Sequence, residues 1–166
     1  KIILPKKFKK NYSEKVLYLP GCYQPNQTKL EISKKNFRKE DFNLPKDSFV
    51  FGCFNNSYKI TPNIFNCWMR ILKKSENSVL WLLISSNIGR DNLKKESIKN
   101  GVDPKRIIFA DRVSVEEHLK RIGLIDLFLD TYPYNAHTTA REAIKMSVPI
   151  LTLIGESFAS RVASSL

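Results

Sequence analysis

After residue 47, short apolar runs alternate with longer amphipathic segments. The apolar runs are continuous, which is typical of strands buried on both faces of a parallel sheet. The segments between them carry apolar residues at helical spacing. We therefore expect an α/β fold, a Rossmann-like parallel sheet with helices on both faces. Strands are predicted at 49–54, 79–84, 106–110, 124–129 and 148–153, and helices begin near residues 61, 90, 114, 138 and 157.

Helix boundaries are marked by capping residues. Thr61 precedes Pro62, a combination of cap and first helical residue that favours a helix start. Gly101 fits the position just after a helix, where a left-handed backbone is common. Two capping boxes are predicted, Ser114 with Glu117 and Thr139 with Glu142.

The first part of the chain lacks this alternation. Residues 1–15 are basic and polar, 16–19 form a short apolar run, and 23–46 are polar with little periodicity. We expect residues 1–47 to be a basic connector and extended segment with one short strand at 16–19. Residues 48–166 then form the Rossmann-like lobe.

The two ends of the chain indicate a larger protein. The sequence begins at Lys1, not at a methionine, and ends at Leu166 within the helix predicted from Ser157. We therefore expect a fragment whose lobe is truncated at its C-terminus. A site shared with other parts of the protein is then incomplete in this chain.

The net charge of the chain adds little to the prediction of its partners. The chain has 28 Lys+Arg against 16 Asp+Glu and a net charge of +12, and a basic balance can indicate nucleic acid, an anionic membrane or an anionic ligand. The lysines are scattered over expected helix ends and solvent faces, where lysine is common. We expect a solvated basic surface and no specific nucleic-acid partner.

Cysteine spacing and apolar run length bear on the compartment. Cys22, Cys53 and Cys67 lie far apart, with neither CxxC nor metal-ligand spacing. Free buried thiols fit a reducing cytosol. No run approaches the length of a membrane span, and no signal peptide is present at Lys1. We expect a cytoplasmic protein without a membrane span.

The clearest candidate chemistry follows the apolar run 124–129. His137, Thr138 and Thr139 open a helix just beyond that predicted strand. Ligands of parallel α/β sheets bind beyond the carboxyl ends of strands, and a helix start offers free N–H groups to an anion. The spacing predicts a phosphate or diphosphate site, with simple helix capping as the alternative.

Two further groups of residues extend this candidate site. Lys59 follows the strand at 49–54 and can reach a phosphate, with a solvent-facing turn as the alternative. His118 and Arg121 are three apart on one predicted helix, hence on one face. Arginine suits phosphate, although from the spacing alone a partly exposed helix face is the favoured alternative.

Several nucleotide motifs do not occur. The chain has neither G-x-G-x-x-G nor G-x-x-x-x-G-K-[ST], which argues against NAD and against a P-loop nucleotide. It also has no Asp-x-Asp, so a divalent metal at a nucleotide-sugar site is not expected. Side chains and helix dipoles would then neutralise a bound diphosphate.

Taken together, these segments resemble the C-terminal catalytic lobe of the protein O-GlcNAc transferase family, glycosyltransferase family 41. The segment 17–25 resembles the bacterial branch of that family. The matches cover most of residues 16–166 in the right order and spacing. The other segments that carry the resemblance are 54–62, 78–83, 106–109, 116–118, 129–131, 137–139 and 155–163.

The resemblance implies a GT-B glycosyltransferase with two facing Rossmann-like lobes and tetratricopeptide repeats ahead of them. Such an enzyme moves GlcNAc from UDP-GlcNAc to Ser or Thr of proteins, with inversion and without metal or other cofactor. Its partners are the nucleotide-sugar donor, a protein or peptide acceptor, the N-terminal catalytic lobe and the repeats. This chain resembles the lobe that binds the nucleotide, and alone it is expected to be inactive.

The resemblance also implies roles at the diphosphate. Lys59 is the catalytic residue that this chain supplies, and it holds the diphosphate together with His137, Thr138 and Thr139. The base histidine of the family belongs to the N-terminal lobe.

The remaining roles concern the nucleoside. The resemblance places Asn56 and the backbone of 110–113 by the uridine, His118 and Arg121 on the uracil and ribose side, and Glu142 at the ribose.

Three positions depart from the animal members of the family. Asn56 stands where Gln is usual, Val115 where Lys is usual, and Glu142 where Asp is usual. The loss of a lysine contact at Val115 leaves donor preference open. The alternatives are a related transferase that uses GDP-fucose or UDP-glucose, and a non-catalytic nucleotide-sugar or protein-binding module.

Overall fold

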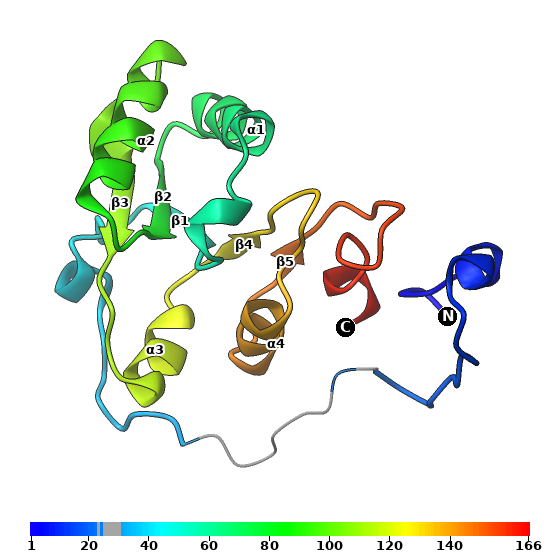
Figure 1. Ribbon diagram of the computed structural model, residues 1–166. Helices are drawn as coiled ribbons and strands as arrows, with labels where there is room; N and C mark the ends of the chain where they lie inside the picture. Colours follow the sequence, from blue (N-terminus) through cyan, green and yellow to red (C-terminus); the bar gives the residue numbers. More distant parts are fainter. Residues whose placement is uncertain (23, 25–30) are drawn as a thin grey trace.

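The computed structural model describes residues 1–22, 24 and 31–166. Its centre is a five-stranded sheet in the order β3-β2-β1-β4-β5 (Figure 1). Every neighbouring pair of strands is parallel. This arrangement confirms the predicted α/β, Rossmann-like fold. The strands are β1 (Phe49–Cys53), β2 (Ser78–Leu83), β3 (Ile107–Ala110), β4 (Leu127–Leu129) and β5 (Ile150–Leu151).

Four of the five predicted helices are present and begin close to the predicted residues. They are α1 (Pro62–Lys74), α2 (Asn87–Lys99), α3 (Val115–Ile122) and α4 (Thr138–Lys145). The Thr61 hydroxyl accepts from the backbone N–H of Ile64, so Thr61 caps α1 as predicted. Ser114 caps α3 in the same way by accepting from Glu117 N.

Buried aromatic and aliphatic side chains fill the space between sheet and helices. Trp81 and Phe128 on the strands and Trp68 and Met69 on α1 are nearly or fully inaccessible to solvent. Gly52 in β1 lies so close to Ile125 that a Cβ atom there would overlap that side chain. The Ile125 side chain, in the turn before β4, therefore packs directly against the backbone of β1.

Strand order creates a switch point between β1 and β4. From β1 the chain moves outward through β2 to β3, and it then returns to the other side of β1 for β4 and β5. The chain leaves the carboxyl ends of the adjacent strands β1 and β4 toward opposite sides of the sheet. Open parallel sheets bind their ligands at such a switch point. On the β4 side, α3 and α4 contact each other (Figure 1).

The N-terminal part differs from the prediction. Residues 16–19 are not in a strand, and Leu17 is 82% exposed. This run lies apart from the sheet, and the Tyr18 hydroxyl donates instead to the Leu4 carbonyl at 3.0 Å. The basic segment forms the 3-10 helix η1 (Lys6–Asn11), and η2 (Lys39–Phe42) precedes β1. The resemblance at 17–25 includes Tyr23 and Pro25, which lie outside the described residues.

The predicted helix from Ser157 is also wrong. Residues 157–162 form turns, and only the short 3-10 helix η5 (Ala163–Ser165) follows. The Ser157 and Ser160 side chains bond to each other at 2.9 Å, and Ser160 Oγ also donates to the Ser157 carbonyl. Such local bonds compete with the helical ladder.

Some strands are shorter than predicted. The strand expected over 124–129 begins only at Leu127, because the N–H groups of Leu124 and Ile125 donate to Arg121 and Ile122 in a turn after α3. In the parts of the chain that the structure covers, no helix has the length and apolar character needed to cross a membrane.

Candidate functional site

The loops after β1 and β4 meet through the buried side chain of Asn55. Its Nδ2 donates to Thr131 Oγ1 at 2.8 Å and to Asp130 Oδ1 at 3.2 Å. Its Oδ1 accepts from the hydroxyl of Thr139, in the first turn of α4. One amide side chain thus connects β1, β4 and the amino end of α4.

Asp130 is the buried acid of this network. Its Oδ1 accepts from the backbone N–H groups of Thr131 at 2.7 Å and Ala136 at 2.6 Å. Its Oδ2 accepts from Thr152 Oγ1 at 2.7 Å. Burial raises the pKa of the Asp130 carboxyl, and the hydrogen bonds from Thr152, Ala136, Thr131 and Asn55 act in the opposite direction by favouring the charged form.

Lys59 ends the 3-10 helix η3 (Ser57–Lys59), and its ammonium group lies on the loop after β4. Nζ donates to the Asn135 carbonyl at 3.0 Å and sits 3.8 Å from the centre of the Tyr134 ring. Burial lowers the Lys59 pKa, while the charge of Asp130 raises it. A positive charge is therefore held beside the start of α4, where the helix also favours an anion.

His137 is the N-cap residue of α4. Its ring lies 5.2 Å from that of Tyr134, and its Nε2 is buried without a hydrogen-bond partner in the described structure. Burial lowers the His137 pKa, and the charge of Lys59 lowers it further. A hydrogen bond with the Ala159 backbone and the charge of Asp130 oppose this shift. Nε2 is thus an unsatisfied buried polar atom at the start of α4.

A second cluster is built on α3 and α4. Arg121 is buried, and its Nη1 donates to the Asp111 carbonyl at 2.6 Å. Its Nη2 lies 3.0 Å from His118 Nδ1, and its guanidinium lies 5.1 Å from the centre of the Phe54 ring. Because arginine can only donate, His118 Nδ1 accepts, and the ring proton of neutral His118 is on Nε2.

His118 Nε2 faces Glu142 Oε2 across 3.8 Å. Burial lowers the pKa of His118 to about 4, with a further contribution from the charge of Arg121. Burial also raises the pKa of the Glu142 carboxyl, against a smaller opposite effect of Arg141. At neutral pH, His118 is therefore uncharged, and the pair is a polar contact and not a salt bridge.

The structure groups the sequence-predicted residues in two clusters. Lys59 and His137 both contact Tyr134, while His118, Arg121 and Glu142 form the cluster on α3 and α4. Asn56 and Thr138 are exposed on the rim of the strand ends.

Thr139 plays a different part from the one predicted. Its hydroxyl is committed to Asn55, and His137 occupies the N-cap position of α4. Thr139 and Glu142 are therefore not a capping box. The Thr139 hydroxyl donates to the buried Oδ1 of Asn55, and Glu142 faces His118.

The sequence did not single out Asn55, Asp130, Thr131 and Asn135 as a network. The sequence did contain a signal for this network: Asp130 directly follows the predicted strand 124–129, and a helix start comes a few residues later. A carboxylate in that place is near the free N–H groups of the loop, so it commonly accepts from them.

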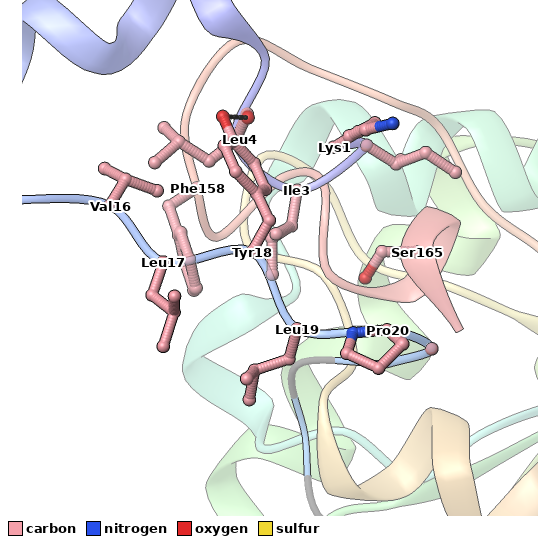
Figure 2. A pocket seen from close by; sticks show the side chains of 12 residues that line it. Lys1, Ile3, Leu4, Val16, Leu17, Tyr18, Leu19, Pro20, Phe158 and Ser165 are labelled. Carbon is pink, nitrogen blue, oxygen red and sulfur yellow. Dashed lines mark hydrogen bonds between the residues drawn. The ribbon is translucent and has the colours of Figure 1, made fainter.

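A cavity lies elsewhere in the molecule. It has a volume of about 700 Å³ and opens between the N-terminal segment and the last residues of the chain. Leu4, Leu17, Leu19 and Phe158 line it with mostly apolar side chains (Figure 2). The buried polar groups described above do not line it, so we place the candidate site at the strand ends of β1 and β4.

Comparison with known families gives one match over most of the chain. The model of glycosyl transferase family 41 matches residues 24–166. The chain is 41% identical over 170 residues to the probable UDP-N-acetylglucosamine–peptide N-acetylglucosaminyltransferase SEC of Arabidopsis thaliana, covering 99% of this chain and 17% of that protein. It is 39% identical to the UDP-N-acetylglucosamine–peptide N-acetylglucosaminyltransferase of Caenorhabditis elegans, covering 76% of this chain and 11% of that protein.

Two solved structures are similar to the chain, one in sequence and fold and the other in fold alone. A mutant of the Thermobaculum terrenum O-GlcNAc transferase superposes with a TM-score of 0.83 at 26% identity, over 99% of this chain and 31% of that one. A putative UDP-N-acetylglucosamine 2-epimerase from Listeria monocytogenes shares the fold, with a TM-score of 0.50 and 14% identity over 76% of this chain and 33% of that one. The chain thus spans only 11–17% of the length of the two curated relatives.

Proposed function

The chain belongs to glycosyl transferase family 41, and from this premise we propose that it is the nucleotide-sugar-binding lobe of a protein O-glycosyltransferase. The enzyme would move GlcNAc from UDP-GlcNAc to Ser or Thr of proteins, with inversion and without a metal. The observation that carries this proposal is the position of Lys59 beside the amino end of α4, at the switch point between β1 and β4.

The chemistry of the leaving group supports these positions. Negative charge builds on the diphosphate as the bond to the sugar breaks, so groups aimed at the diphosphate favour the transition state. Lys59 supplies a positive charge, and the first turn of α4 supplies N–H groups with the helix dipole behind them. Burial already lowers the Lys59 pKa, and a bound phosphate would hold the lysine in its charged form.

The nucleoside would occupy the other side of the crevice. His118, Arg121 and Glu142 offer a polar wall there, and the Phe54 ring packs against both His118 and Arg121. Neutral His118 is oriented by Arg121, with its Nε2 proton directed toward Glu142. Such an oriented set suits the hydroxyls of a ribose, in line with the roles that the resemblance implies.

Activation of the acceptor would depend on parts of the protein outside this chain. The acceptor hydroxyl needs a base, and the resemblance assigns that histidine to the N-terminal lobe. The protein acceptor, the second lobe, the tetratricopeptide repeats and the cytoplasmic location therefore all stay predictions. We expect this lobe alone to bind the donor but not to transfer sugar.

Calorimetry of the full-length protein with UDP, in EDTA and then with excess Mg²⁺, tests the proposal. We expect equal binding in both buffers, and weaker binding of GDP. Binding of UDP only with Mg²⁺ would contradict metal independence, and preference for GDP would favour the fucosyl alternative. Binding of UDP-GlcNAc without transfer to any acceptor peptide would favour the non-catalytic module.

A further inference from the structure

We propose that Asp130 is a positioning residue of the donor site, which sets the place of Lys59 and of the amino end of α4 without touching the ligand. The proposal rests on the proposed function, since the donor site is the one described above. Its basis is the set of groups that converge on one buried carboxylate.

The first contacts close the loop between β4 and α4. The N–H groups of Thr131 and Ala136 both donate to Asp130 Oδ1, at 2.7 and 2.6 Å. These residues lie at the two ends of the segment 131–136, so one oxygen fixes both ends. A loop pinned in this way has few conformations left to lose when a ligand binds.

The next contacts join the neighbouring strands. Asn55 Nδ2, from the loop after β1, donates to the same Oδ1 at 3.2 Å. Thr152 Oγ1, directly after β5, donates to Oδ2 at 2.7 Å. The carboxylate therefore holds together the ends of three adjacent strands at the edge where the ligand would bind.

The pinned loop carries the partners of Lys59. The lysine donates to the Asn135 carbonyl at 3.0 Å and sits over the Tyr134 ring, and both residues belong to the segment that Asp130 closes. Asn55 passes the connection on to α4, because its Oδ1 accepts from Thr139. Asp130 is thus connected to Lys59 through the loop and to the first turn of α4 through Asn55.

Two substitutions separate the hydrogen-bond acceptor role of Asp130 from its negative charge. In Asp130→Ala, the N–H groups of Thr131 and Ala136 and the Asn55 amide lose a buried acceptor. In Asp130→Asn, the side chain keeps its shape and one acceptor oxygen, while the negative charge is removed. The second variant keeps the test open if the first does not fold.

Asp126, directly before β4 at the amino ends of the strands, is a control with similar contacts, although it is exposed and Asp130 is buried. Its Oδ2 accepts from the Val50 backbone N–H at 2.8 Å and from Lys39 Nζ at 3.2 Å. It therefore also joins a strand to a neighbouring segment through a backbone N–H and a side-chain donor. Asp126→Ala should lower stability without affecting the donor site.

The experiment measures affinity for UDP and for uridine in the full-length protein, together with hydrogen exchange at 131–136. For Asp130→Ala we expect the Kd of UDP to rise about tenfold or more and that of uridine less than about threefold, since only the phosphate groups depend on the loop. Asp130→Asn should show a smaller change in the same direction. The loop amides should exchange faster in both variants and stay unchanged in Asp126→Ala.

If Asp130→Ala weakened the binding of UDP and of uridine equally, the proposal would be overturned. The same holds if Asp126→Ala weakened UDP binding more than uridine binding to the same extent as Asp130→Ala, because either result would show a general loss of stability. Unchanged UDP affinity in both Asp130 variants would overturn it as well. If the unmodified protein binds no UDP, the proposed function itself fails, and this result is seen before any variant is compared.

Discussion

The ammonium group of Lys59 lies 3.8 Å from the centre of the Tyr134 ring. The two residues come from different strand ends, since Lys59 follows β1 and Tyr134 follows β4. A cation over an aromatic face is held without being neutralised, because the ring carries no formal charge. The lysine is therefore pre-positioned and still available to an anion, and its energetic role can be tested with ligands that differ only in phosphate.

Lys59→Ala should weaken the binding of UDP more than that of uridine. A charge-assisted contact contributes roughly 1.5–3 kcal/mol, so we expect the Kd of UDP to rise about tenfold to a hundredfold. Titration calorimetry with both ligands measures the difference. Lys105→Ala serves as the control, because this exposed lysine precedes β3 at the other edge of the sheet. Equal losses for UDP and uridine would place Lys59 away from the diphosphate.

The parallel sheet was predictable because its strands are buried on both faces. A continuous apolar run such as 79–84 leaves no face for solvent, so it fits the interior of a sheet covered by helices on both sides. The same rule failed at 16–19, where a run of similar character forms no strand and its two leucines are exposed. Apolar character shows that a segment can be buried, but the presence of a neighbouring strand depends on the whole fold.

The placement of two candidate residues at strand ends could be predicted from the sequence, while their roles stay predictions. Lys59 and His137 follow strand ends and carry groups suited to phosphate, so position and type agreed. Asp130 was harder, because an acid after a strand is equally compatible with solvent. Its role depends on the N–H groups of Thr131 and Ala136 turning back toward it, and that geometry is a property of the folded loop.

Thr138 and Thr139 should respond differently to loss of their hydroxyls. Thr139→Ala removes the donor to the buried Asn55 oxygen, which should lower the free energy of unfolding by about 1–3 kcal/mol. Thr138 is exposed at the start of α4, so Thr138→Ala should change it by less than about 0.5 kcal/mol while weakening UDP binding. Urea unfolding and UDP titration of both variants provide the measurements. A larger loss of stability in Thr138→Ala would contradict this assignment.

The basic surface should bind nucleic acid only weakly. Lysines in the last turns of α1, α2, α3 and α4 are dispersed over separate helix ends. We expect a Kd of about 10⁻⁴–10⁻⁶ M near physiological salt and a steep loss of affinity as salt rises. Titration of labelled single- and double-stranded oligonucleotides at two salt concentrations checks this. Tight, sequence-selective binding at high salt would favour the binding-module alternative.

His118 should make stability depend on pH between about 4 and 6.5. Its pKa falls from 6.5 to about 4 on folding, so in this window the unfolded chain binds a proton that the folded chain does not. Stability then rises with pH. The contribution is complete above 6.5 and is lost as pH falls toward 4, with a total of roughly 3 kcal/mol.

The variant His118→Asn should flatten this part of the profile, because asparagine does not titrate and can still accept from Arg121. Urea unfolding from neutral pH to about pH 4 gives the slope of stability against pH.

Glu142 contributes a slope of the opposite sign, since its raised pKa lets the folded state keep a proton that the unfolded chain releases as pH rises above 4.5. His137 also has a lowered pKa, so His137→Asn isolates the share of the only other histidine in the chain. If His118→Asn leaves the slope as steep as in the unmodified protein, His118 is not the neutral, buried group that Arg121 orients.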